Sequence, residues 1–375
     1  MTTETNTTVQ PALLFMPDIS GFTEFVNSTE ITHAQSIIQE VLEIIIESNQ
    51  INLEIGEIEG DAIFFYRIGK APTMEQLLQQ VQNMFIKFHR HLQMYDKQRI
   101  CPCAACSSAT QLKLKIIAHF GPVSGYSVKS HRKLFGRDII LLHRLLKNNL
   151  NKKEYALLTD PLIEGAGTSG SLPEWFLPEE AKEQYDVGEI SFKVTDLSKL
   201  KENLPEVLPE QFNSVARTKT IFTAEGLIHA PAQQVFGAIF DLALRPKWMD
   251  GIQRVEMITK DLINRIGTMH RCVVNKKNNP IMVTEYASIG EGTAELIEMD
   301  RKGIAGCRFK VAAINDEETE LKVDMLVKKN PLLLMIFNLF MKGKLQKQMS
   351  RSIENLKEFC KPSFVNPQVM ANNLN

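Results

Sequence analysis

The sequence predicts an α+β protein built from two domains. A single hydrophobic core rarely extends over as many as 375 residues, so two or three domains are expected. Apolar strands alternate with periodic helices in the first half, and a polar stretch with two prolines follows. A strand, a helix, several alternating strands and a long helix then complete the chain. We therefore expect a disordered tail at 1–10, a domain at 11–197, a linker at 198–220, a domain at 221–361 and a tail at 362–375.

Composition and charge exclude several classes of protein. Hydrophobic residues make up 44% and charged residues 23%, which is ordinary for a globular protein. The formal net charge of −1 gives no general attraction to nucleic acid, so we expect no nucleic-acid partner. The N-terminus has no apolar signal region, and the longest apolar run, 331–341, is too short to cross a bilayer. These features predict a cytoplasmic protein without a transmembrane segment.

Periodicity places the elements of the first domain. Apolar residues at three- and four-residue spacing, such as Ile38, Val41, Leu42 and Ile45, predict a helix at 32–48. By the same criterion the other helices lie at 22–26, 73–95 and 139–150. Short apolar or alternating runs predict strands at 12–15, 51–55, 62–68, 111–120, 155–159 and 189–194. Gly121, Pro122 and Gly125 are expected to end the strand that begins at 111.

Two acidic residues stand next to predicted strands of this domain. Asp18 follows the first strand, and Asp61 precedes the strand at 62–68. A β-α-β-β path can bring both to one edge of a sheet, where Mg²⁺ takes one or two carboxylates together with phosphate oxygens. The backbone N–H groups of the helix start could face a phosphate; its residues are Gly21, Phe22 and Thr23. The alternative is that Asp18 caps that helix and Asp61 occupies a turn.

These segments resemble a known family. DISGFT followed by EGDAIFF is similar to the catalytic core of class III nucleotidyl cyclases, the adenylate and guanylate cyclases. IIAHFGPVSGYSV at 116–128 and KLFGRDIILLHRLL at 133–146 extend the resemblance in the same order, over roughly 11–197. It implies a ferredoxin-like core sheet covered by helices. The whole chain also resembles an uncharacterised bacterial family that joins such a domain to a START-like one.

The cyclase resemblance implies roles for individual residues. Asp18 and Asp61 would hold Mg²⁺ or Mn²⁺ for a nucleotide triphosphate, with the Ile19 carbonyl as an auxiliary ligand. Arg144 would stabilise charge on the transferring phosphoryl group, for which a guanidinium is well suited. The family forms its site between two such domains. Because this chain has only one, the resemblance implies a homodimer in which Arg144 of one copy faces the acids of the other.

Three positions depart from the family pattern. Glu57 stands where the family has a purine-selecting lysine, and Lys133 stands where it has the partner acid. Ile140 replaces the asparagine that orients the ribose and donates no hydrogen bond. The resemblance therefore implies either a domain that binds nucleotide with slow or no turnover, or an enzyme with altered substrate reading. Glu57 and Lys133 could also form an ion pair that only stabilises the domain.

Three cysteines crowd together between a helix and a strand. Cys101, Cys103 and Cys106 form a CxCxxC cluster that could bind Zn²⁺, with a fourth ligand from elsewhere. His89 and His91 are the nearest donors upstream. The alternatives are three reduced thiols in a loop, or a redox sensor.

The second domain is read from element order. Strands are predicted at 220–229, 269–275, 281–287, 293–299, 306–315 and 318–327, with helices after Pro231 and from 331 to about 359. The segment HAPAQQVFGAIFDLALRPKWMDGIQRVE at 229–256 and the final helix resemble the START-like, helix-grip superfamily (SRPBCC) over about 222–360, and the element order supports this. The resemblance implies a cavity for an apolar small molecule. Its expected lining residues are Trp248, Met249, Leu333, Phe337, Phe340 and Met341. The alternative is core packing. The apolar run at 331–341 is followed by lysines and could touch a membrane surface, but we expect it to form a buried helix.

Three functions remain open from the sequence. The first is a slow or degenerate cyclase-like signalling domain joined to a ligand-binding START-like domain. The second is an active purine nucleotidyl cyclase regulated by that domain. The third is a carrier of a hydrophobic ligand, with the cyclase-like half acting only as a dimer scaffold.

Overall fold

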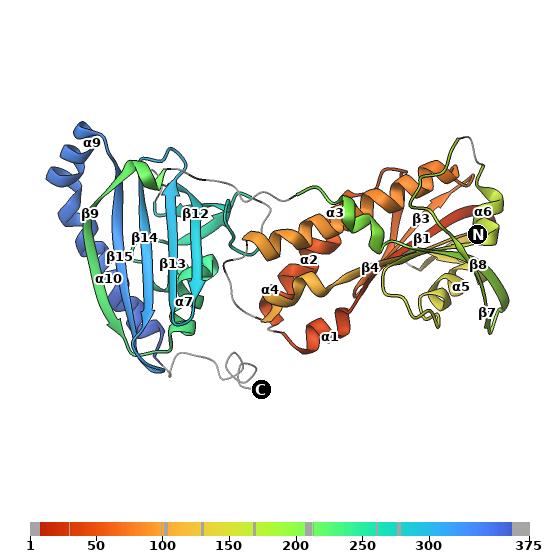
Figure 1. Ribbon diagram of the computed structural model, residues 1–375, viewed down its shortest axis with the longest axis horizontal. Coiled ribbons are helices and arrows are strands. Elements are labelled where there is room, and N and C mark those ends of the chain that lie inside the picture. Colours follow the sequence, from red (N-terminus) through yellow and green to blue (C-terminus); the bar gives the residue numbers. More distant parts are fainter. Residues whose placement is uncertain are drawn as a thin grey trace, which may run out of the picture. The chain divides into compact units, whose positions relative to one another are not determined.

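The computed structural model describes residues 8–361, apart from 30, 99, 101–103, 129–130, 168–169, 207–211, 213, 260–261 and 276–278. The chain forms two compact units, each mixed α+β with its own sheet (Figure 1). The first unit consists of residues 1–28, 38–94 and 108–207, and the second consists of residues 29–37, 95–107 and 208–375. No described helix is long and apolar enough to cross a membrane.

The sheet of the first unit has the strand order β2-β3-β1-β4-β6-β8-β7, and β5 pairs with the far end of β4. Every pair is antiparallel except β4 with β6. The strands are β1 (Gln10–Ser20), β2 (Glu54–Glu59), β3 (Ala62–Ile68), β4 (Lys113–Val128), β5 (His131–Phe135), β6 (Tyr155–Thr159), β7 (Glu179–Tyr185) and β8 (Gly188–Asp196). The helices up to residue 165 are α1 (Phe22–Asn27), α2 (Ile31–Glu47), α3 (Met74–Gln98), α4 (Ala104–Ser108), α5 (Arg137–Leu145) and α6 (Asp160–Gly165).

Strand β1 is the centre of the first unit. Residues Ala12 to Met16 are all buried, because β1 lies between β3 and β4 and is covered on both faces. Ala12, Leu14 and Met16 share one face and pack in a core cluster with the apolar side of α5, which contributes Leu141, Leu142 and Leu145. This continuous apolar run is typical of a strand that has no solvent-facing side.

Several boundaries differ from the prediction. Strand β4 does not end at Gly121 but continues to Val128, because it pairs with β1 through Val123 and then with β5. The strand expected at 51–55 is β2, which begins only at Glu54, after the left-handed residue Asn52. Helix α5 ends at Leu145, five residues earlier than expected. Strand β7 was not predicted, since its charged edge sequence lacks an apolar face.

The sheet of the second unit is entirely antiparallel, in the order β10-β11-β12-β13-β14-β15-β9. Its strands are β9 (Thr218–Ile228), β10 (Arg254–Met257), β11 (Met269–Val273), β12 (Ile281–Gly290), β13 (Thr293–Asp300), β14 (Ala305–Ala313) and β15 (Thr319–Lys328). Six coincide with predicted strands, and β10 was not predicted. The helices are α7 (Ala232–Phe240), α8 (Arg245–Trp248), α9 (Pro331–Ile336) and α10 (Lys342–Phe359), and the π-helical turn η5 (Phe337–Met341) joins the last two.

Helix α10 closes the core of the second unit. Its buried side carries Met349, Ile353 and Leu356, which join the core cluster with residues of β9, β14 and α7. Gly226 on β9 is required at this contact, because a Cβ there would overlap the Ile353 side chain. The long C-terminal helix was predicted as a single element, but the structure interrupts its α-helical register at η5.

A buried polar chain attaches α5 to the first sheet. The His119 imidazole of β4 lies 2.7 Å from Thr159 Oγ1 and 2.8 Å from Asp138 Oδ1, in the first turn of α5. Gly121 makes room for this arrangement, since a Cβ at that position would lie 2.5 Å from Asp138 Cγ.

We expect Gly121→Ala to displace Asp138 and lower the free energy of unfolding of the first unit by about 1–3 kcal/mol. Chemical denaturation measures this loss, with Gly167→Ala as the control because a Cβ there meets nothing within 4 Å. Equal stability of the two variants would contradict the role given to Gly121.

Candidate functional site

Asp18 lies on β1, whereas Asp61 lies in the turn between β2 and β3, as the alternative from the sequence had it. Asp18 pairs with Ala62 of β3, the residue directly after Asp61. The Ile19 N–H donates to the Asp61 carbonyl at 3.2 Å. Because the N–H and C=O of one strand residue point to the same neighbour, the Ile19 carbonyl also faces β3. The backbones of both acids and this carbonyl therefore lie at the same end of β1 and β3, and the charge of Asp18 acts on Asp61.

The helix start near Asp18 differs from the expectation. Asp18 lies inside β1, which runs on to Ser20, and it does not cap α1. The N-cap is Gly21, whose φ of 89° is left-handed and favours glycine. Helix α1 has only six residues, so Phe22 and Thr23 do not open a long helix whose dipole could hold a phosphate.

Lys115 is the residue of this site that the sequence reasoning missed. It stands directly opposite Asp18 in the β1–β4 register, and its Nζ lies 2.9 Å from Asp18 Oδ2. The same ammonium donates to the Leu146 carbonyl at 3.1 Å, just beyond the end of α5. Both side chains of the pair are largely buried, at 18% exposed for Lys115 and 14% for Asp18. The only sequence signal is a lysine directly before the apolar run at 116–118.

The electrostatics show that the two carboxylates compete for positive charge. Burial, followed by the charge of Asp18, raises the pKa of Asp61 to about 6. Carboxylate and carbonyl oxygens are the donors that Mg²⁺ and Mn²⁺ prefer. Among the described residues, no group of three or more His, Cys, Asp or Glu side chains could hold a metal. A divalent ion at this place would therefore need its remaining ligands from water or from a bound phosphate.

The two residues at the positions expected to read the base form an ion pair with each other. Lys133 Nζ lies 3.2 Å from both carboxylate oxygens of Glu57, and this exposed pair links β5 to β2. The sequence had left this ion pair as one alternative, and the structure shows it.

Arg144 and Ile140 lie one turn apart on α5. Ile140 is 49% exposed. Arg144 forms an ion pair with Asp186 at 3.0 Å, and both of these side chains are about half exposed. An exposed pair of this kind contributes little stability, so the guanidinium can exchange partners at low cost.

The cysteine cluster is only partly visible, because Cys101 and Cys103 lie outside the described residues. Cys106 is buried, with its Sγ 3.7 Å from His33 Nδ1. The two histidines suggested as donors have other partners: His89 contacts Glu154 at 2.9 Å and His91 contacts Glu40 at 3.1 Å. A zinc site remains a prediction from sequence.

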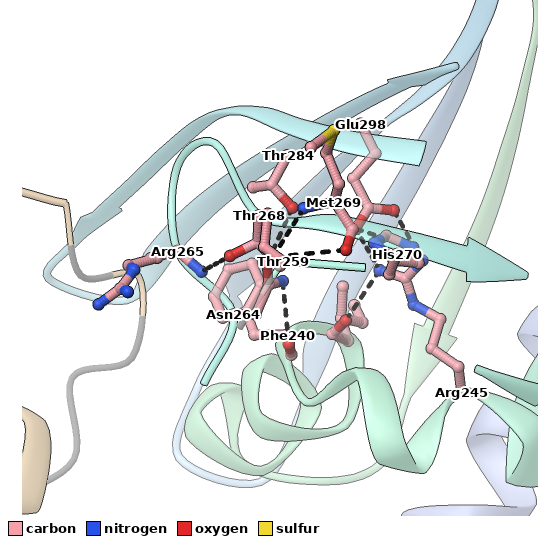
Figure 2. Close-up of polar contacts among 11 residues, drawn as sticks. Phe240, Arg245, Thr259, Asn264, Arg265, Thr268, Met269, His270, Thr284 and Glu298 are labelled. Atoms are coloured by element: carbon pink, nitrogen blue, oxygen red, sulfur yellow. Dashed lines mark hydrogen bonds and ion pairs between the residues drawn. The ribbon is translucent and has the colours of Figure 1, made fainter. Parts of the chain in front are cut away.

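The second unit contains a buried ion pair (Figure 2). The Arg245 guanidinium of α8 donates to both carboxylate oxygens of Glu298 on β13, at 2.7 and 2.9 Å, and each side chain is 2% exposed. Burial alone would raise the pKa of Glu298, but the charge of Arg245 holds it below its ordinary value. His270 Nε2 lies 4.0 Å from the same carboxylate, and burial lowers the pKa of His270 to about 4. The imidazole beside this pair is therefore neutral at pH 7.

Two cysteine thiols lie near this ion pair. Burial raises the pKa of Cys272 to about 11 and that of Cys307 to about 12, so both are protonated at pH 7. Figure 2 also shows a polar chain beside the pair, in which Thr284 Oγ1 donates to Asn264 and Asn264 donates to the Phe240 carbonyl. These groups fix β12 and the loop before β11 to the end of α7.

The residues expected to line an apolar cavity differ in how far they are buried. Trp248 is buried, donates from Nε1 to the Ala238 carbonyl at 2.8 Å and meets Phe309 edge to face, which makes it a packing residue. Met249 packs against the same core. Phe337 is buried, whereas Phe340 and Met341 are exposed. The run at 331–341 is thus not the buried helix that was expected.

Comparison with known proteins gives similarity without a function. Residues 38–155 match the model of a family described as a protein of unknown function, DUF2652. An uncharacterized protein of Mycobacterium tuberculosis is 32% identical over 125 residues, which are 33% of this chain and 58% of that protein. The chain therefore matches little more than half the length of that relative.

Solved structures of cyclases are among the structural neighbours. A bacterial light-regulated adenylyl cyclase has a TM-score of 0.39 at 13% identity, over 54% of this chain and 57% of that one. The adenylyl cyclase CyaB of P. aeruginosa has a TM-score of 0.33 at 14% identity, over 51% and 96%. Likeness at these values carries no functional conclusion, which must come from the residues themselves.

Breaking the buried ion pair should destabilise the second unit strongly. We expect Glu298→Ala to cost about 3–5 kcal/mol, because it leaves the Arg245 charge buried without a counter-charge. Replacing both partners, as Arg245→Met with Glu298→Leu, should restore most of the loss. Urea unfolding of the second unit measures both, with the exposed Glu320→Ala as the control. A double variant as unstable as Glu298→Ala would contradict this account.

Proposed function

We propose that the first unit is a class III cyclase-like domain that binds a nucleotide triphosphate with Mg²⁺ or Mn²⁺, with slow or no turnover. The observation that carries this proposal is that the end of β1, with Asp18 and Ile19, lies beside the β2–β3 turn that carries Asp61. The four sequence segments shared with cyclases support it, since they supply these residues in the family's order.

Each residue has a separate task in this proposal. A divalent ion held by Asp18 and Asp61 would supply Lewis-acid chemistry at the phosphate oxygens. Lys115 pairs with Asp18 in its absence, and its positive charge offsets part of the repulsion between the two partly buried carboxylates. Arg144 is the phosphate-facing cation, because its exposed pair with Asp186 leaves it able to turn to a triphosphate.

Slow turnover follows from the other half of the site. Glu57 and Lys133 carry the reverse of the charges that the family uses to read a purine, and they pair with one another. Ile140 offers no donor to a ribose, and losing one positioned donor typically costs on the order of 10²–10³ in rate. The alternative, an active purine nucleotidyl cyclase, would need a different means of orienting the ribose.

We infer that the first unit acts as a homodimer, with Arg144 reaching the acids of the other copy. Apolar residues exposed on β2, β5 and α5 support this, because an interface would cover them: Ile55, Ile58, Phe135 and Ile140. A two-fold axis would create two equivalent sites.

For the second unit we propose a START-like, helix-grip fold that binds an apolar small molecule. Its element order supports this: a strand and two helices precede six antiparallel strands, and α10 returns across β9. Met249 and Phe337 remain the lining residues in this proposal, since both lie near the inner side of the closing helix. A hydrophobic-ligand carrier with a dimeric scaffold is the alternative if the first unit binds no nucleotide.

Calorimetric titration with Mn²⁺, with and without ATP or GTP, tests the nucleotide proposal. The wild type should bind Mn²⁺ more tightly with nucleotide present, and Asp18→Ala and Asp61→Asn should each abolish this binding. Asp316→Asn, an exposed acid of the second unit, is the control. Incubation with ATP and GTP should give little or no cyclic product, and fast formation would favour the active cyclase. If nucleotide does not change Mn²⁺ binding by the wild type, only the hydrophobic-ligand carrier remains.

The same titration should depend on pH. With its pKa near 6, Asp61 holds a proton below that pH and must lose it to bind a cation. Mn²⁺ affinity should therefore fall about tenfold from pH 7 to pH 5. A flat profile between these values would exclude Asp61 as a ligand.

Lys115 should oppose metal binding, because its ammonium occupies the place of a cation beside Asp18. We expect Lys115→Met to increase Mn²⁺ affinity by roughly tenfold, since the two carboxylates then lack any other counter-charge. Lys113→Met, on the same strand but paired with Glu154, is the matched control. Unchanged or weaker Mn²⁺ binding by Lys115→Met would show that the lysine does not compete.

A further inference from the structure

The outer side of the C-terminal helix carries an apolar stripe in the second unit. Its residues recur at three- and four-residue spacing, which places them on one side of a helix: Leu332, Met335, Ile336, Leu339 and Phe340. All five are exposed, and Phe340 reaches 76% and Leu339 69%. The buried apolar residues of α10 show the same spacing and face the core. Core packing therefore does not explain the exposed stripe.

The ends of this stripe are basic. Every charged residue between Asp324 and Glu354 is a lysine or arginine. Lys328 and Lys329 precede the stripe, and Lys342, Lys344 and Lys347 follow it on the first turns of α10. Among the residues that the structure describes, these last three have no ion-pair partner.

The stripe is presented by a firmly ordered helix start. The Asn330 side chain accepts hydrogen bonds from the N–H groups of Leu332 and Leu333, at 3.0 and 3.1 Å, and Pro331 occupies the first helical position. Phe337 anchors the inner side in the protein. Figure 1 shows α9 continuing from α10 along the β9 side of the sheet. The exposed apolar side chains therefore belong to a fixed surface of this unit.

We propose that this stripe docks the second unit onto an anionic lipid surface, lying in the interface without spanning it. Aromatic and aliphatic side chains would enter the acyl boundary, while the flanking lysines meet the negatively charged headgroups. A second copy of the chain fits less well, because a two-fold contact would bring identical basic segments together. The pattern of an apolar patch between two basic clusters is the charge complement of a membrane surface.

Co-sedimentation of the full chain with vesicles tests this docking. The probes are vesicles of phosphatidylcholine alone and vesicles that also contain about 30% phosphatidylserine. The wild type should bind the anionic vesicles more tightly, and rising salt should weaken this binding. Leu339→Ser with Phe340→Ser should reduce binding to the anionic vesicles by roughly tenfold or more. Lys344→Glu with Lys347→Glu should cause a similar loss there and little change on neutral vesicles.

Two matched variants control for general effects. Ile314→Ser removes an equally exposed apolar side chain elsewhere in the second unit, and Lys302→Glu reverses an exposed charge outside the segment. Both should bind like the wild type. Because all substituted residues are exposed, thermal unfolding should be unchanged throughout. The proposal would be overturned if the wild type bound neither kind of vesicle, or if the stripe variants bound the anionic vesicles as tightly as the wild type. So would self-association that the stripe variants abolish in the absence of vesicle binding.

Discussion

The pairing of Asp18 with Lys115 is the interaction on which the first unit's site depends. A central strand buried on both faces tolerates a carboxylate only if a cation accompanies it, and β4 supplies that cation directly across the ladder. The same lysine reaches the Leu146 carbonyl, so the charge of the site is tied to the end of α5 and hence to the helix that carries Arg144. Charge balance at Asp18 and the position of the end of α5 are thus parts of one arrangement.

The pairing of Lys115 with Asp18 does not balance the charge of the nearby Asp61. Lys115 contacts Asp18, while the carboxyl of Asp61 is left to hold a proton to higher pH than an isolated aspartate would. A divalent ion would relieve both acids at once, which is the physical basis of the proposal for the first unit. The Glu57–Lys133 pair differs, because its two opposite charges are exposed and already lie side by side.

The sequence predicted most elements but few partners. Periodicity located β3, β6 and the apolar sides of the helices, because these depend on local spacing alone. It missed the continuation of β4 past Gly121, which depends on β5 as a second partner, and the charged edge strand β7. Asp18 and Asp61 could be named from local motifs. Lys115 and the Arg245–Glu298 pair could not, since each rests on a strand register or a helix position that only the folded chain defines.

The π-helical turn between α9 and α10 has a consequence for how this surface can change. Each residue of a helix advances the side chains by about 100°. Loss of one residue within 337–341 would turn the exposed apolar side chains that precede this segment, Leu332, Met335 and Ile336, to a new azimuth, while α10 stayed seated on Gly226. A single-codon deletion could thus re-aim this surface without disturbing the core beneath it, which makes η5 a natural point for divergence between relatives.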